Sequence, residues 1–225
     1  MLENQKEILS ELLPFWNNIN HKSKEQLLYQ AEEVHFKKGA HLHAGKEKCS
    51  GLFLLKSGRI RAYIVTEEGK EVTLFRLLDR DVCIFSAACM MKNISFEIYI
   101  SAETDVDAIR IPTKVYDELS KEEVSIAHFT SEILGARMSE VMWVLEKILF
   151  MSFDKRLAYF LLEESQLEQS NTLTITHEQV ASHLGSAREV ISRMLKYFSK
   201  EGLVKVERGR IILVKEEGLR KLAGY

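Results

Sequence analysis

The spacing of hydrophobic positions changes twice along this 225-residue chain, and each change predicts a different kind of structure. Between residues 2 and 30 the apolar side chains recur at helical spacing and Pro14 interrupts them, which predicts one or two short helices. From about Val34 to Ile111, short runs of branched and aromatic residues alternate with glycine or charged turns, most clearly at residues 51–58, 60–65 and 71–77. Strands this short and evenly spaced are typical of an antiparallel β-barrel or β-roll.

A heptad pattern follows in the segment from Thr113 to Phe150, which has no proline and a single glycine. Apolar residues spaced by sevens predict a coiled-coil seam of about three heptads. Other faces of this segment are apolar too, so we expect one face to meet a second copy of the chain and another to pack on the β-domain. The alternative is a core helix of a monomeric bundle. The predicted seam consists of Ala127, Leu134, Met138, Val141, Leu145 and Ile148.

Helix-capping signals mark the C-terminal third, which follows a predicted hinge at residues 151–154, a helix at 153–167 and a short strand at 171–176. Thr176 and Gln179 form a capping box that opens a short helix, and Gly185 ends it. Ser186, with Glu189 three residues later, predicts the cap of a second helix. Two capped helices joined at a glycine predict a helix-turn-helix.

The polar face of this second helix has the chemistry to read DNA. Arginine pairs with guanine O6 and N7, and glutamate accepts a hydrogen bond from cytosine N4. A charged face that is merely solvated is the alternative, but the capped helix before it and the predicted hairpin after it favour DNA binding. That hairpin, residues 202–206 and 210–214, carries Arg208 and Arg210 near its tip, where they would contact phosphate. The polar face consists of Arg188, Glu189, Ser192, Arg193 and Lys196.

The distribution of charge fits this interpretation. The chain carries a net charge of −2, but residues 171–225 contain ten Lys/Arg and six Asp/Glu and are therefore positive. A basic segment in an otherwise acidic chain is typical of a domain that binds the phosphates of nucleic acid.

The order of these parts resembles the Crp/Fnr family of bacterial regulators over nearly the whole chain. The most specific stretch is Ile175-Thr-His-Glu-Gln-Val-Ala-Ser-His-Leu-Gly-Ser-Ala-Arg-Glu-Val-Ile-Ser-Arg-Met-Leu, followed by Glu201-Gly-Leu-Val and Arg208-Gly-Arg-Ile. Its Glu-x-x-Ser-Arg pattern is similar to the Fnr branch, which implies TTGA half-sites in an inverted repeat. We expect the DNA-binding residues to be Thr176, His177, Ser186, Arg188, Glu189, Ser192, Arg193, Lys196, Arg208 and Arg210.

The resemblance implies an α+β fold in three parts. These are N-terminal helices with a cyclic-nucleotide-binding-like β-roll (residues 1–112), a long dimerisation helix (113–150) and a winged helix-turn-helix (151–225). We expect a cytoplasmic, homodimeric transcription regulator that binds double-stranded DNA and RNA polymerase. No stretch is apolar enough for a membrane span, and no catalytic motif is visible, so we expect neither a membrane partner nor an enzyme.

Departures from the family pattern bear on the effector. Cyclic-nucleotide binders carry a Gly-Glu pair and an Arg-Ser/Thr pair, whereas Phe85-Ser86 stands in place of the first pair and no arginine lies between Asp81 and Ile109. We therefore expect no cyclic AMP binding, because a cyclic phosphate would lack a cation. The four-cysteine iron–sulfur cluster of the Fnr branch is not expected either, since no cysteine precedes Cys49. Haem or another small ligand remains an alternative.

Two further sensor hypotheses come from single residues. The chain has three cysteines, an odd number, which argues against a disulfide framework and for a reducing compartment. Cys83 and Cys89 are candidates for a reversible disulfide. The alternative is that both are small residues of the core. His35, His41 and His43, with Cys49 nearby, could ligate a metal or haem, but their spacing matches no strong metal motif. His41 and His43 would share a face if that segment is an extended strand.

Overall fold

The computed structural model describes residues 2–44, 51–84 and 97–224, and the chain divides into two compact units. The first unit contains Met1–Ile64 and Leu74–Val141, and the second contains Val65–Thr73 and Met142–Tyr225. No helix among the described residues is both long and apolar enough to cross a membrane.

The N-terminal helices of the first unit follow the predicted break. Helix α1 (Leu2–Leu12) ends before Pro14, and the short helix η1 (Trp16–Asn18) and α2 (His21–Gln30) follow. Leu9, Leu13 and Leu27 are fully buried, so these helices belong to the core of the unit. The prediction of short helices broken near Pro14 is confirmed.

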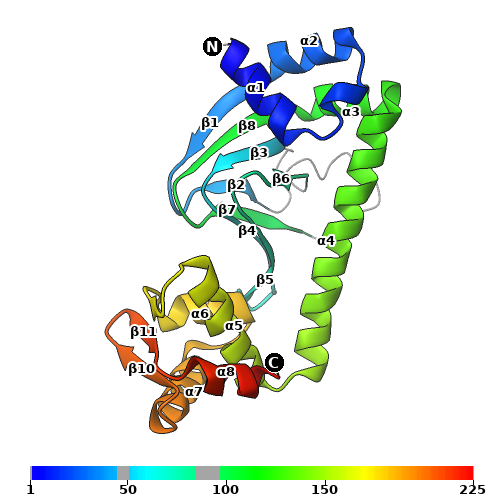
Figure 1. Cartoon of the computed structure of the whole chain (residues 1–225). Helices are drawn as coiled ribbons and strands as arrows, with labels where there is room; N and C mark the ends of the chain where they lie inside the picture. The colour runs from blue at the N-terminus through cyan, green and yellow to red at the C-terminus, as the bar shows by residue number, and fades with distance from the viewer. Residues whose placement is uncertain (1, 45–50, 85–96, 225) are drawn as a thin grey trace. The chain divides into compact units, whose positions relative to one another are not determined.

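The β-roll consists of two sheets among the described residues (Figure 1). One sheet has the order β1 (Glu32–Phe36), β8 (Val106–Ile111), β3 (Leu52–Ser57) and β6 (Val82–Cys83). The other has the order β2 (His41–Ala44), β7 (Tyr99–Ala102), β4 (Ile60–Val65) and β5 (Glu71–Leu77). Both sheets contribute fully buried side chains to one hydrophobic core, among them Leu52, Leu54, Ile60, Ile100 and Ile109.

The predicted long helix begins later than residue 113, although all of its heptad positions lie within it. Residues 113–150 form two helices, α3 (Thr113–Glu122) and α4 (Val124–Phe150), separated by Glu123 in an extended conformation. The side chain of Glu123 accepts hydrogen bonds from Asn20 and Ser23 at the start of α2, and these bonds hold the break in place. The prediction of a single helix starting at Thr113 is therefore wrong, whereas its end at Phe150 is confirmed.

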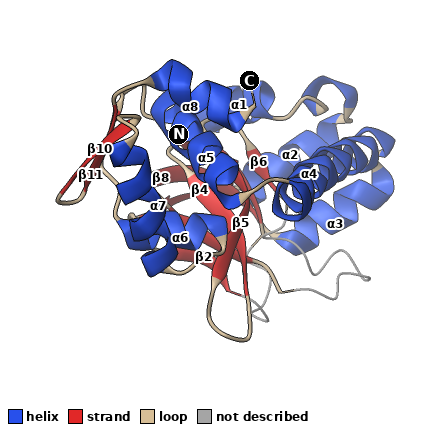
Figure 2. Ribbon diagram, turned by 90° about the horizontal axis from the view of Figure 1, so that it is seen from below, coloured by secondary structure: helices blue, strands red, loops and turns tan. Residues whose placement is uncertain are grey.

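The second unit contains the predicted winged helix-turn-helix, seen from below in Figure 2. Its helices are α5 (Phe153–Leu167), α6 (His177–Leu184), α7 (Arg188–Lys200) and α8 (Glu216–Ala223). A sheet of order β10 (Val204–Glu207), β11 (Arg210–Leu213), β9 (Thr172–Leu173) completes it. The predicted two-stranded wing thus gains β9 as a third strand, and the sequence analysis did not anticipate α8, whose Leu219 is fully buried.

Candidate nucleic-acid interface

The first helix of the helix-turn-helix begins at the predicted capping box. The Thr176 hydroxyl accepts from the backbone N–H of Gln179, and the Gln179 side chain accepts from the backbone N–H of Thr176. These bonds satisfy donors that the first turn of a helix leaves unpaired. Thr176 therefore has a structural task in addition to its predicted place among the DNA-binding residues.

The turn between α6 and α7 differs from the prediction by one residue. Gly185 adopts the expected left-handed conformation, with φ 64°, at the end of α6. The N-cap of α7 is Ala187, however, and no side chain caps this helix. The predicted cap at Ser186 is therefore wrong; the backbone N–H of Ser186 donates to the carbonyl of Ala181 at the end of α6.

Helix α7 separates an apolar face from a polar one as the spacing predicted. Ile191, Leu195 and Phe198 are fully buried and pack in the core of the unit. Arg188, Glu189, Arg193 and Lys196 are exposed, and Ser192 is half-buried among them. The residue types that can read base edges therefore lie on the solvent-exposed face of α7, and the opposite, apolar face packs in the core and fixes the helix.

A hydrogen-bond chain that the sequence analysis missed joins α6 to this polar face. Nδ1 of His177 lies 2.8 Å from the Ser192 hydroxyl oxygen, and that hydroxyl donates to the backbone carbonyl of Arg188 at 2.9 Å. Burial, and then the positive charge of Arg188, lower the pKa of His177 below its ordinary value. Ser192 is thus held in one orientation by groups of the protein itself.

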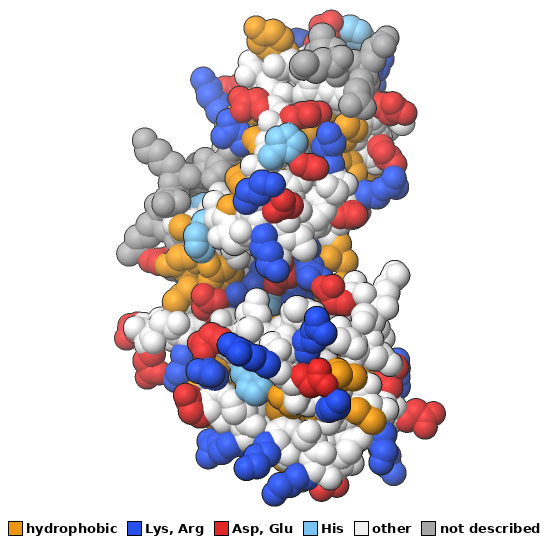
Figure 3. All heavy atoms as spheres, turned by 90° about the vertical axis from the view of Figure 1, so that its left-hand side faces the viewer, with side chains coloured by type: hydrophobic (Ala, Val, Ile, Leu, Met, Phe, Trp, Pro, Cys, Tyr) orange, Lys and Arg blue, Asp and Glu red, His pale blue; other side chains and the backbone are white. Residues whose placement is uncertain are grey.

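The wing presents its arginines to solvent. Glu207 pairs with Arg210 across β10 and β11, and Arg208 and Gly209 form the tip between them. Arg208 and Arg210 are both exposed, while Glu207 forms an ion pair with Lys205 at 2.8 Å. Figure 3 shows Lys and Arg side chains gathered along the lower edge of this view. Both arginines are therefore accessible from solvent, and their contact with phosphate stays a prediction.

Only some residues of the predicted dimerisation seam are exposed to solvent. Met138, Leu145 and Ile148 are exposed by 60%, 44% and 40%. Leu134 and Val141 are half-buried because they pack against the core of the first unit. Ala127 is half-buried as well. Met142, Leu149 and Phe150 add further exposed apolar surface toward the end of α4.

A lysine side chain lies between two aromatic rings next to the predicted hinge, where α4 ends at Phe150 and α5 begins at Phe153. Nζ of Lys147 lies 3.5 Å from the ring centroid of Trp143 and 4.4 Å from that of Tyr159. Burial lowers the pKa of Lys147, while the charge of Glu163 opposes that shift. Because Trp143 belongs to α4 and Tyr159 to α5, the ammonium joins the two helices across their connection.

The structure describes only one of the two cysteines of the redox hypothesis. Cys83 lies on β6 opposite Phe53 of β3 and is 1% exposed. Cys89 lies outside the described residues, as do Cys49 and the Phe85-Ser86 pair that bears on cyclic-nucleotide binding. A buried thiol meets oxidants or electrophiles less readily than an exposed one, which favours the core interpretation for Cys83.

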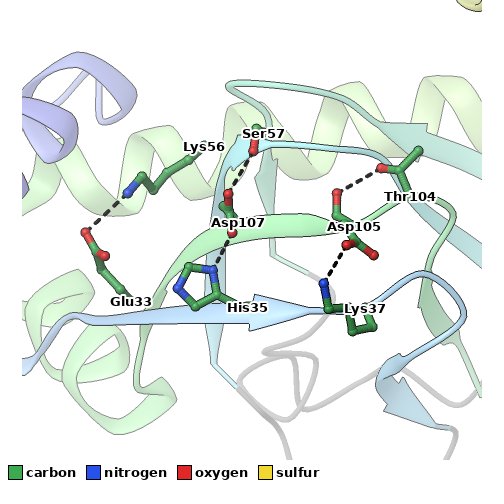
Figure 4. A network of polar contacts seen from close by, with 8 residues as sticks. All are labelled: Glu33, His35, Lys37, Lys56, Ser57, Thr104, Asp105 and Asp107. Atoms are coloured by element: carbon green, nitrogen blue, oxygen red, sulfur yellow. Dashed lines mark hydrogen bonds and ion pairs between the residues drawn. The ribbon is translucent and has the colours of Figure 1, made fainter.

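The three histidines of the β-roll lie in different surroundings. His35 on β1 contacts Asp107 of β8 in a polar network on the surface of the roll (Figure 4). His41 is exposed and His43 is 3% exposed, because an irregularity between them in β2 shifts the register. The expectation that His41 and His43 share a face is therefore wrong. Among the described residues, no group of three or more His, Cys, Asp or Glu could hold a metal ion.

A buried cation in the roll also escaped the sequence analysis. Arg61 on β4 is 8% exposed, and its guanidinium lies over the ring of Tyr63 at 4.3 Å. The sequence argument against a phosphate partner considered only arginines between Asp81 and Ile109, so it did not weigh this residue. Arg61 pairs with Ser101, and the core residue Ala62 pairs with Ile100. Arg61 therefore projects from the face of its sheet opposite to the core.

Two helices joined by a left-handed turn at Gly185, a second helix with a buried apolar face and an exposed Arg/Glu/Arg face, and an arginine-tipped wing define a winged helix-turn-helix DNA-binding protein. The comparisons agree with this class. A Crp-like helix-turn-helix domain matches residues 155–222, and a cyclic nucleotide-binding domain matches residues 33–123. The crystal structure of a transcriptional regulator assigned to the Crp/Fnr family, from Eubacterium rectale, is 46% identical, covers 95% of this chain and 99% of its own, and has a TM-score of 0.93.

The chain belongs to the Crp/Fnr family of transcriptional regulators. Among curated relatives, electron transport regulator A of Shewanella oneidensis is 29% identical over 94% of this chain and 86% of its own length. The fumarate and nitrate reduction regulatory protein of Escherichia coli K12 is 28% identical over 84% of this chain and 77% of its own length. The protein is thus a transcription regulator of the Crp/Fnr type with a helix-turn-helix DNA-binding domain.

Proposed function

We propose that this regulator binds DNA as a homodimer, with two α7 helices in successive major grooves of an inverted repeat of TTGA-like half-sites. The observation that carries the proposal is the exposed face of α7, where Arg188, Glu189, Ser192 and Arg193 stand opposite a buried apolar face. In this arrangement Arg193 pairs with a guanine and Glu189 accepts from a cytosine amino group. The arginines of the wing contact phosphate and fix the register without reading sequence.

The dimer is supported by the exposed apolar side chains of α4. Met138, Leu145 and Ile148 recur at spacings of seven and three along one helix and remain exposed in the single chain. Apolar surface of this kind, in a heptad pattern, is what a coiled-coil partner covers. A second copy placed there sets two recognition helices about 34 Å apart, one turn of B-DNA.

The half-site is taken from the Glu-x-x-Ser-Arg pattern, which is similar to the Fnr branch of the family. The similarity to the fumarate and nitrate reduction regulatory protein of Escherichia coli supports this choice. We further propose that a signal received in the β-roll shifts the fraction of dimers whose recognition helices are correctly placed. Cyclic AMP and a four-cysteine iron–sulfur cluster are not the proposed signals, because the residues that hold them in the family are missing from this sequence. RNA polymerase is the proposed protein partner.

The test is fluorescence anisotropy of a labelled TTGA–TCAA inverted repeat against a scrambled duplex, with and without reductant. Preferential binding to the repeat supports the proposal, and an effect of reductant would favour Cys83 and Cys89 as the sensor. Selection from random DNA that returns no inverted repeat, with purified dimer, would contradict the proposal.

A further inference from the structure

The side chain of His177 connects the start of α6 with the DNA-facing side of α7. It is the first residue of α6, and its Nδ1 lies 2.8 Å from Oγ of Ser192. Ser192 lies between Arg188 and Arg193 on the polar face, so the imidazole stands beside the residues proposed to meet DNA. The inference below rests on the proposed function.

The hydrogen-bond chain favours one position for the proton on the imidazole ring. A serine hydroxyl has one proton to donate, and the Ser192 hydroxyl donates it to the carbonyl of Arg188 at 2.9 Å. With this proton on the Arg188 side, Oγ accepts from His177 and Nδ1–H is the donor. A neutral histidine has one N–H, so Nε2 carries a lone pair and no proton.

This tautomer makes the neutral ring unsuited to phosphate. Phosphate oxygens accept hydrogen bonds, and an unprotonated Nε2 also only accepts. When His177 takes up a proton, Nδ1–H keeps its bond to Ser192 and Nε2–H becomes a donor with a positive charge. In the part of the chain that the structure describes, no hydrogen bond to Nε2 is found, and the side chain is half-buried.

The charges around the ring favour its neutral form while DNA is absent. Burial is the larger cause of the lowered pKa of His177, and Arg188, which faces it from α7, is the second. Glu178 follows it on its own helix but contributes no resolved effect. A phosphate placed near the ring would act in the opposite direction, because a nearby negative charge favours a protonated imidazole.

We propose that His177 is a proton-linked phosphate contact: each DNA-binding domain takes up one proton at Nε2 of His177 when it binds DNA, with Ser192 as the residue that fixes the ring. Binding then strengthens as the pH falls through the pKa of His177 in the complex. The gain is complete once the pH lies below its pKa in the free protein. A rise of one pKa unit on binding corresponds to about a tenfold gain per half-site.

The test measures the dissociation constant for a labelled duplex between about pH 5.5 and pH 8, the range around the ordinary histidine pKa. The whole 225-residue chain is used with its inverted repeat and, at low salt, with a random-sequence duplex. Phosphate contacts act on both duplexes. We expect affinity to rise by about tenfold per half-site toward acid pH in the native chain. The variant His177→Arg, a permanent cation, should bind tightly at every pH, and His177→Gln should bind more weakly at acid pH with no such slope.

His183→Gln is the matched control, because it removes another histidine of α6 and should keep the native pH response. A native chain whose affinity is flat over this range, or an equal slope in His177→Gln, would overturn the proposal. So would ring ¹⁵N shifts that show Nε2–H as the neutral tautomer of His177. If the repeat and the random-sequence duplex bind equally at every pH, the proposed half-site fails instead, while both duplexes still report the proton uptake.

Discussion

Nη2 of Arg156 donates a hydrogen bond of 2.6 Å to the backbone carbonyl of Leu184, the last residue of α6. Carbonyls in the last turn of a helix have no partner within that helix. Arg156 belongs to α5 and is partly buried, and burial lowers the pKa of its guanidinium. A charged donor from α5 thus fixes the end of α6 and, with it, the start of the turn into the recognition helix.

The variant Arg156→Met should destabilise the second unit by about 1–3 kcal/mol, because it leaves a partly buried carbonyl without its charged donor. Urea unfolding monitored by circular dichroism measures this change. The neighbouring Lys155 is exposed, so Lys155→Met should change stability by less than about 0.5 kcal/mol. Equal effects of the two substitutions would show that the bond to Leu184 does not anchor α6.

Local signals made much of the second unit predictable from sequence. The bonds of the capping box join Thr176 and Gln179, three residues apart, and the left-handed turn at Gly185 depends on one residue type. The contacts that were missed join residues far apart in the chain. His177 and Ser192 are 15 residues apart, and Arg156 and Leu184 are 28 apart, so neither pairing is visible until the helices are packed.

In the first unit, too, the features that the sequence did not predict depend on contacts between residues far apart in the chain. The heptad pattern correctly predicted a helix ending at Phe150, but the preceding segment is helical too, and no proline or glycine marks the break at Glu123. The break depends on hydrogen bonds from Asn20 and Ser23, about a hundred residues earlier in the chain. The irregularity in β2 that separates His41 from His43 likewise arises in its pairing with β7.

Glu123 supplies a pH-dependent prediction for the first unit. Hydrogen bonds from Ser23, and then from the backbone of Asn20, lower the pKa of its carboxyl. A depressed folded-state pKa contributes stability above the unfolded value, near 4.5, and that stability is lost as the pH falls through the folded value. Glu123→Gln should therefore lower stability at neutral pH and reduce the loss on acidification.

Urea titrations at several pH values between about 3 and 7 test this expectation, since carboxyl groups titrate in that range. We expect Glu123→Gln to cost about 1–2 kcal/mol at neutral pH, because charge-assisted bonds are replaced by weaker ones. Glu122 is exposed and adjacent, so Glu122→Gln serves as the control. A native-like acid response in Glu123→Gln would mean that other carboxyl groups cause it.

The proposed dimer predicts the effect of charge on α4. Leu145→Glu combined with Met138→Glu places carboxylates on the exposed apolar face, where a partner would have to bury them. The double variant should sediment as a folded monomer at concentrations where the native chain is dimeric. Glu146→Gln, an exposed change beside Leu145, should leave the dimer intact. A double variant that stays dimeric would place the interface elsewhere.

The wing arginines should contribute affinity without sequence preference. Arg208→Glu and Arg210→Glu each remove a proposed phosphate contact, so binding to every duplex should weaken alike. The slope of log affinity against log salt should become shallower by about one for each lost contact. Lys221→Glu in α8 is a control of equal charge change. A loss of preference for the inverted repeat with an unchanged salt slope would assign base reading to these arginines.

The central claim is that the polar face of α7 reads bases, and Arg193 tests it most directly. Anisotropy titrations compare the native chain and Arg193→Ala on the TTGA repeat and on a repeat whose half-site guanine is replaced by adenine. The native chain should prefer guanine by about 1–3 kcal/mol per half-site, and Arg193→Ala should bind both repeats with the same, weaker affinity. If Arg193→Ala keeps the full preference for guanine, Arg193 does not read that base, and the proposed orientation of α7 on DNA is wrong.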